Sequence, residues 1–97
     1  MASIEQVKAG QYEISGVLDF STVSALLTQI HGLQLEPIAT LDFSRLENAN
    51  SAGLALLLEL LADARKQNRK LIFSGLPDSL LDLAKMSNVK HLLVSDS

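Results

Sequence analysis

The chain of 97 residues is long enough for one small domain and too short for two. Hydrophobic residues make up 47% and aromatic residues only 4%, so the core must consist mainly of Leu, Ile, Val and Ala, and the aromatic platforms that stack nucleic-acid bases are scarce. The net charge of −3 argues against a protein that binds nucleic-acid phosphates, and the absence of cysteine excludes disulfides and thiolate metal sites.

The sequence shows no targeting or membrane-spanning pattern. The first residues, MASIEQ, have no basic segment followed by an apolar one, so we expect no signal peptide. The longest apolar run, residues 54–58, is far shorter than the roughly 20 residues that a membrane-spanning helix needs. We therefore expect a cytoplasmic protein.

The first third of the chain predicts a β-hairpin and one helix. Residues 4–7 and 11–15 are β-prone runs, and Gly10 between them permits a hairpin loop. The hydroxyl residues 21–22 are suited to begin a helix, which we expect to end at Gly32. Apolar side chains recur on one face of this helix: Val23, Leu26, Leu27 and Ile30.

The middle of the chain predicts a strand, a loop and a leucine-rich helix. Residues 38–43 are almost continuously apolar, which is typical of a central strand buried on both faces. A polar loop is expected at residues 44–49, and a helix from Ser51 to Asn68. Four leucines form the apolar stripe that we expect to face the sheet: Leu54, Leu57, Leu58 and Leu61.

The last third predicts a strand at residues 70–74, a helix that begins near Pro77 and stops at residues 87–88, and a final strand or docked tail at residues 91–94. The element order is then β-β-α-β-α-β-α-β. Strand–helix–strand units imply parallel pairing with right-handed crossovers, and the hairpin adds an antiparallel edge. We predict one α/β domain over residues 1–97, with a mixed β-sheet covered by about three to four helices.

The segment Asn50-Ser51-Ala52-Gly53 is the most distinctive candidate for function. Ser51 is expected at or next to a helix N-terminus, where free backbone N–H groups and the helix dipole favour negative charge. A hydroxyl there can carry a phosphate or contact a partner. The simpler interpretation is that Ser51 is a plain N-cap, worth about 1 kcal/mol.

A helical projection at 100° per residue predicts a small docking surface beside Ser51. Ala52 falls on the polar side of the helix with Glu59, and Leu56 falls at its border. Together with Ala55, these residues give a flat, partly apolar face of the kind that a docking helix presents. The alternative is that a neighbouring element covers Leu56.

The remaining polar residues predict no catalytic or metal site. No Gly-x-Ser-x-Gly elbow or P-loop is present, and neither histidine is placed by sequence near a serine nucleophile. His31 is expected to interact with its own helix C-terminus, and Asp19 and Asp42 to cap loops at strand ends. The basic residues 65–70 are expected to be a solvated helix end, or a contact with an acidic partner or a membrane surface. We expect no enzymatic activity, no cofactor and no metal.

Two segments, SGVLDFSTV at residues 15–23 and NSAGLALLLELL at residues 50–61, resemble elements of the STAS domain family, whose best-known members are bacterial anti-sigma-factor antagonists. In that family the first hydroxyl residue of the second segment is the regulatory position, which Ser51 holds here. The usual preceding Asp is Asn50, which cannot supply a carboxylate to a metal or kinase site and so disfavours a phosphorylation switch. The partner-binding or regulatory site implied is Asn50, Ser51, Ala52, Gly53, Ala55, Leu56 and Glu59, with Ser51 as a possible phosphosite.

A narrower resemblance is to the STAS subunits of ABC-type phospholipid transporters in Gram-negative bacteria, and it rests on residues 53–58, 64–67 and 83–85 and on Asn88. It implies a non-enzymatic regulatory subunit that docks on the cytoplasmic ATPase, and through it on the permease at the inner membrane, and helps to maintain outer-membrane lipid asymmetry. The alternative is an anti-sigma-factor antagonist switched by a serine kinase at Ser51. A small-ligand or lipid carrier is a third class, which the little spare volume of 97 residues disfavours.

Overall fold

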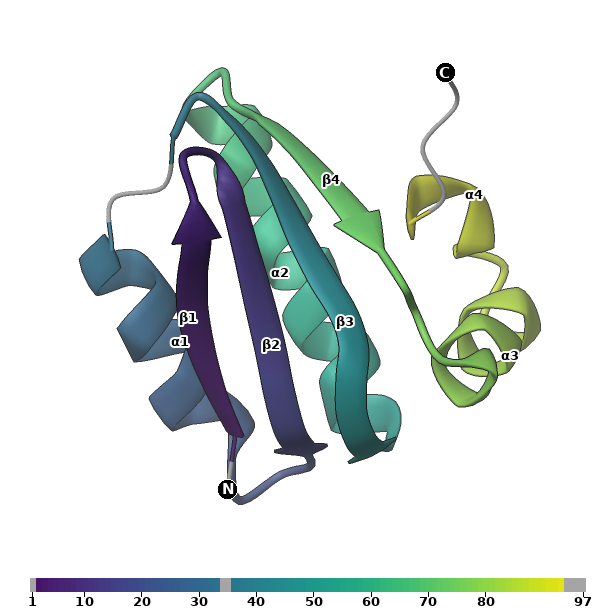
Figure 1. The fold of residues 1–97 in the computed structure, drawn as a ribbon. Coiled ribbons are helices and arrows are strands. Elements are labelled where there is room, and N and C mark those ends of the chain that lie inside the picture. Colours follow the sequence, from purple (N-terminus) through teal and green to yellow (C-terminus); the bar gives the residue numbers. More distant parts are fainter. Residues whose placement is uncertain (1, 34–35, 94–97) are drawn as a thin grey trace.

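The computed structural model describes residues 2–33 and 36–93 and shows a mixed four-stranded sheet with helices (Figure 1). The elements of this part of the chain are β1 (Ala2–Lys8), β2 (Gln11–Leu18), α1 (Val23–Leu33), β3 (Ile38–Ala49), α2 (Ser51–Lys66), β4 (Lys70–Ser74), α3 (Asp78–Met86) and α4 (Lys90–Leu93). The strand order is β1-β2-β3-β4. The pair β1–β2 is antiparallel, whereas β2–β3 and β3–β4 are parallel. The predicted fold class and the antiparallel edge are confirmed.

The sheet is covered on one face. Figure 1 shows α1 and α2 behind the strands, and no described helix covers the opposite face. In β3 the side chains accordingly alternate: Ala39 and Leu41 are buried, whereas Ile38 is 63% exposed. The prediction that this strand is buried on both faces is therefore wrong. A half-covered sheet needs only every second residue to be apolar.

Two further elements differ from the predictions. Residues 44–49 continue β3 instead of forming a loop, because their backbone keeps pairing with β2 as far as Leu18 opposite Ala49. Asp42 therefore lies inside the strand and not at its end. The final element is the helix α4, whose Leu93 is buried, instead of a strand or a docked tail. Val94, which was included in that expected element, lies outside the described residues.

The ends of α2 and α3 are set by asparagines in the left-handed conformation. Asn68 has φ 56°, its N–H donates to the carbonyl oxygen of Arg65 at 3.3 Å, and the N–H of Arg69 donates to that of Ala64 at 2.8 Å. This pair of bonds is a Schellman motif, which satisfies the last carbonyls of a helix. Asn88, with φ 63°, ends α3 in the same way. Both helices thus stop within two residues of the predicted positions.

The core lies between the sheet and the helices. Its largest fully buried side chains are Phe43, Ile14, Leu18, Leu26, Leu41, Leu57 and Leu80. Phe43 and Phe73 meet edge to face, with ring centroids 5.5 Å apart. In the described part of the chain no polar side chain is buried, and no helix has the length and apolar character required to cross a membrane.

Candidate functional site at the start of helix α2

Helix α2 begins at the edge of the sheet where the parallel strands end (Figure 1). Asn50 is the single residue between β3 and α2. Its backbone N–H donates to the carbonyl oxygen of Leu18, the last residue of β2, at 3.0 Å. The first turn of α2 and the loop that leaves β2 are therefore neighbours.

Asn50 is the N-cap of α2. Its backbone is extended, and its Oδ1 accepts a hydrogen bond from the N–H of Ala52 at 2.9 Å. Ser51 is the first helical residue, its side chain is exposed, and its hydroxyl bonds to none of the described residues. The interpretation of Ser51 as a plain N-cap is therefore wrong. Asn50 performs this task and leaves the Ser51 hydroxyl at the surface.

Two small residues allow the first turn of α2 to lie directly on β2. A Cβ atom added to Gly53 would lie 3.1 Å from the Cβ of Leu18, tighter than nearly all real contacts. Ala52 is buried, with 3% of its surface exposed. Although both belong to the predicted partner site, they pack the helix start against the sheet instead of offering atoms to a partner.

The predicted exposure of Ala52 and Leu56 is wrong, because α2 is rotated relative to the simple projection. Leu56 is 4% exposed, which confirms the alternative interpretation that a neighbouring element covers this side chain. Leu58 and Leu61, which were expected to face the sheet, are half-buried and line a groove with Leu92 of α4. The helix contacts α1 on one flank and α3 and α4 on the other. Its buried arc is consequently wider than one stripe.

The surface that remains is a row of residues four apart on the exposed side of α2. We call Ser51, Ala55 and Glu59 the exposed row; all three are exposed. Residues at this spacing lie above one another on a helix. With Asn50, which is also exposed, they are the members of the predicted site that a partner can reach.

The loop after β2 lies beside the start of α2 and carries residues that were not among the predicted site residues. Phe20 is 78% exposed. The neighbouring Asp19 accepts hydrogen bonds from the hydroxyl of Ser21 at 2.6 Å and from its N–H at 2.8 Å, and these bonds hold the pKa of the Asp19 carboxyl below its ordinary value. The loop presents an exposed ring beside a carboxylate held in its charged form. The sequence could have indicated this feature, because an aromatic residue, Phe20, stands between Asp19 and Ser21 in a turn.

The other candidate residues form no site at this edge. His31 Nε2 lies 3.0 Å from Asp63 Oδ2 of α2, and thus bonds to another helix instead of its own C-terminus as predicted. The residues described contain no cluster of three side chains that could hold a metal. Asp42 accepts a hydrogen bond from the N–H of Ser44 at 3.0 Å, which is a local contact within β3.

The fold and the Asn50–Ser51 segment define a STAS domain. The family model described as "Mlab, STAS domain" matches residues 3–95, and the chain therefore belongs to this family.

The family membership is supported by two curated relatives. The chain is 34% identical over 76 residues to the "Intermembrane phospholipid transport system binding protein MlaB" of Escherichia coli (strain K12), covering 78% of this chain and 77% of the relative. It matches the protein of the same name from Shigella flexneri with the same identity and coverage.

A solved structure confirms the fold. The anti-sigma factor antagonist SpoIIAA in its unphosphorylated form superposes with a TM-score of 0.70 at 18% sequence identity, over 100% of this chain and 89% of that one. At this identity the similarity shows the common architecture, so the predicted STAS fold is confirmed.

Proposed function

We propose that this protein is a non-enzymatic regulatory subunit that docks on the cytoplasmic ATPase of an ABC-type phospholipid transporter. The observation that carries the proposal is that Asn50 caps α2, so that the exposed Ser51 hydroxyl has no structural task. The matched relatives are named as binding proteins of an intermembrane phospholipid transport system. These names are the reason for proposing a phospholipid transporter as the assembly to which this protein belongs.

The exposed row is suited to a protein partner. Ser51 and Ala55 are small, so a partner helix or loop can approach the α2 backbone closely. Phe20 adds an exposed aromatic ring in the adjacent loop, and aromatic residues, Phe among them, are enriched at protein–protein interfaces. Glu59 adds a charge at the far end of the row, where it can set the orientation of docking.

Docking would act by population shift. A subunit that binds one conformation of the ATPase better than another raises the population of that conformation without chemistry of its own. The partner would hold this protein at the cytoplasmic face of the inner membrane, and transport would serve outer-membrane lipid asymmetry.

The test compares wild type with Ser51→Glu in an affinity pull-down from native membranes, with partners identified by mass spectrometry. The added charge and bulk lie in the centre of the proposed contact, so we expect loss of the ATPase and permease from the captured proteins. Ser79→Glu is the matched control, because Ser79 is the exposed second residue of α3 and lies outside the exposed row. Wild-type recovery with Ser51→Glu would place the contact elsewhere.

A phosphorylation switch is the second candidate, favoured by the exposed hydroxyl at the start of a helix. A phosphate there is tolerated by its own helix and adds about two negative charges to the surface. Incubation with a partner kinase and ATP would then add the mass of one phosphate, and Ser51→Ala would abolish the addition. The absence of Ser51 phosphate in every growth state would exclude this candidate.

A further inference from the structure

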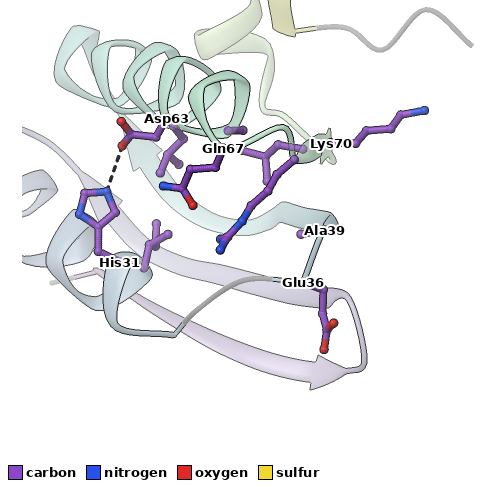
Figure 2. A pocket seen from close by; sticks show the side chains of 11 residues that line it. His31, Glu36, Ala39, Asp63, Gln67 and Lys70 are labelled. Carbon is purple, nitrogen blue, oxygen red and sulfur yellow. Dashed lines mark hydrogen bonds and ion pairs between the residues drawn. The ribbon is translucent and has the colours of Figure 1, made fainter.

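A cleft lies at the opposite end of α2 from Ser51 (Figure 2). It is bounded by the end of α1, the last turns of α2 and the starts of β3 and β4, and its volume is about 300 Å³. This volume is at the lower end of the range for small-molecule sites. No residue of the exposed row lines it.

The floor of the cleft is apolar. Ile30 of α1, Ala39 of β3 and Leu60 of α2 lie at its base and are each at most 3% exposed. Ala64 and Leu71 also line it and are half-buried, so they present apolar surface to the cleft. An aliphatic group of a few carbons placed on these side chains would leave water without displacing any polar protein atom. The floor therefore favours a ligand with an apolar part.

Two acidic groups, Asp63 and Glu36, lie around the cleft, and neither forms an ion pair with Arg69. Asp63 Oδ2 lies 3.0 Å from His31 Nε2, and this contact occupies one of the two carboxylate oxygens. Figure 2 shows the Glu36 carboxylate and the Lys70 ammonium group pointing away from the middle of the cleft. These two exposed groups therefore do not determine whether the cleft prefers an anion or a cation.

Arg69 is the cation that faces this space. The Schellman bond from its N–H to Ala64 fixes its backbone directly after α2, and its side chain lines the cleft beside Gln67. Among the residues described, no carboxylate lies within ion-pair distance of its guanidinium group. A guanidinium fork and an amide N–H₂ are donors that match the oxygens of a carboxylate or a phosphate.

We propose that this cleft binds a small free amphiphilic anion. Its carboxylate or phosphate oxygens accept hydrogen bonds from Arg69 and Gln67, and its apolar part lies against Ala64 and Leu71. The site is separate from the exposed row and does not depend on the partner that docks there.

The test uses the whole protein and four probes with six carbon atoms each: hexanoate, hexyl phosphate, hexanol and hexylammonium. Binding is followed by ¹H–¹⁵N NMR shifts of the backbone. We expect saturable shifts with one or both anions, confined to residues that line the cleft, and at least about ten-fold weaker binding of the alcohol and the amine because they lack charge-assisted bonds to Arg69. The stronger of the two anions identifies the head group.

Variants assign the binding to Arg69. Arg69→Gln is expected to weaken anion binding about ten-fold or more, and Arg69→Lys to retain part of it because the charge remains while the fork is lost. Lys66→Gln is the matched control, because it removes the same charge from the exposed end of α2 outside the cleft.

The proposal would be overturned by any of these results: no saturable shift with either anion, hexanol or hexylammonium binding as tightly as the anions, or an unchanged affinity of Arg69→Gln. The probe selectivity is measured on the wild-type protein, so the proposal remains testable if a variant fails to fold. Loss of partner capture by Ser51→Glu concerns the other end of α2 and has no bearing on this result.

Discussion

The two ends of α2 are packed differently against the rest of the domain. At its start, Gly53 lies so close to Leu18 that an added Cβ would meet it at 3.1 Å, and a side-chain cap closes the first turn. At its other end the same helix leaves a cleft of about 300 Å³ next to a half-exposed pair, His31 and Asp63. A filled, capped end presents a fixed surface to another protein, whereas a hollow end offers room for a small molecule.

The difference follows from side-chain size and from the helix termini. Ala52 and Gly53 bring the start of the helix onto the sheet, and no side chain there projects far enough to hold the layers apart. At the other end α2 stops in a Schellman motif at Asn68, and the longer side chains of Gln67 and Arg69 surround the space instead of filling it. Function is thus proposed on a surface at one end and in a cavity at the other.

The largest expected effect comes from the middle of the helix, on which both ends depend. Leu57 is fully buried, so Leu57→Ala should lower the free energy of unfolding by about 2–5 kcal/mol, through lost apolar burial and the cavity left behind. Urea denaturation followed by circular dichroism measures it. Leu58→Ala is the control, because Leu58 is half-buried on the flank toward α4 and its truncation should cost less.

An equal cost for the two leucines would mean that Leu58 shares the core position, and would favour the original projection of α2. A larger cost for Leu57 would support the rotated helix described here.

A smaller effect tests the start of the helix alone. Asn50→Ala removes the side chain that bonds to the N–H of Ala52 and should lower the free energy of unfolding by about 0.5–2 kcal/mol. Ser51→Ala removes an exposed hydroxyl that bonds to no described residue, so its effect should stay within about 0.5 kcal/mol. The two alanine variants, compared by thermal or urea unfolding, decide which residue caps α2. A larger loss for Ser51→Ala would reverse the assignment.

Much of the fold could be predicted from the sequence because its signals are local. The hairpin at Gly10, the helix ends near Asn68 and Asn88 and the strand–helix alternation all follow from the residue types at those positions. The end of β3 could not be predicted in this way. Its polar residues resemble a loop, and only pairing with β2, which is distant in the sequence, keeps them extended.

The start of α2 was predicted in position, but its cap and its exposed face were not. Asn and Ser are both good N-caps, so the sequence alone could not decide between Asn50 and Ser51. A helical projection shows which residues share a face but not how many neighbours cover the helix, and for that reason Leu56 was placed outside. The contact between His31 and Asp63 joins residues 32 positions apart, and no local pattern indicates it.

The smallest effect is expected at the cleft. The side chains of His31 and Asp63 are 55% and 29% exposed, so the coupling between them should be only about 0.2–1 kcal/mol, as for other exposed pairs. A double-mutant cycle with His31→Gln, Asp63→Asn and both changes together, measured by urea unfolding, isolates this coupling. Repeating the cycle in 1 M salt separates its charged part, because a protonated ring gives a screened ion pair and a neutral ring a hydrogen bond.

A weak coupling would mean that the contact between α1 and α2 at the mouth of the cleft opens at little cost, while the capped start of α2 stays in place. A ligand could then enter without disturbing the exposed row. A coupling above about 2 kcal/mol would exceed what exposed pairs provide. It would show instead that the contact between His31 and Asp63 stabilises its end of the helix at least as much as the Asn50 cap stabilises the start, which would remove the contrast between the two ends.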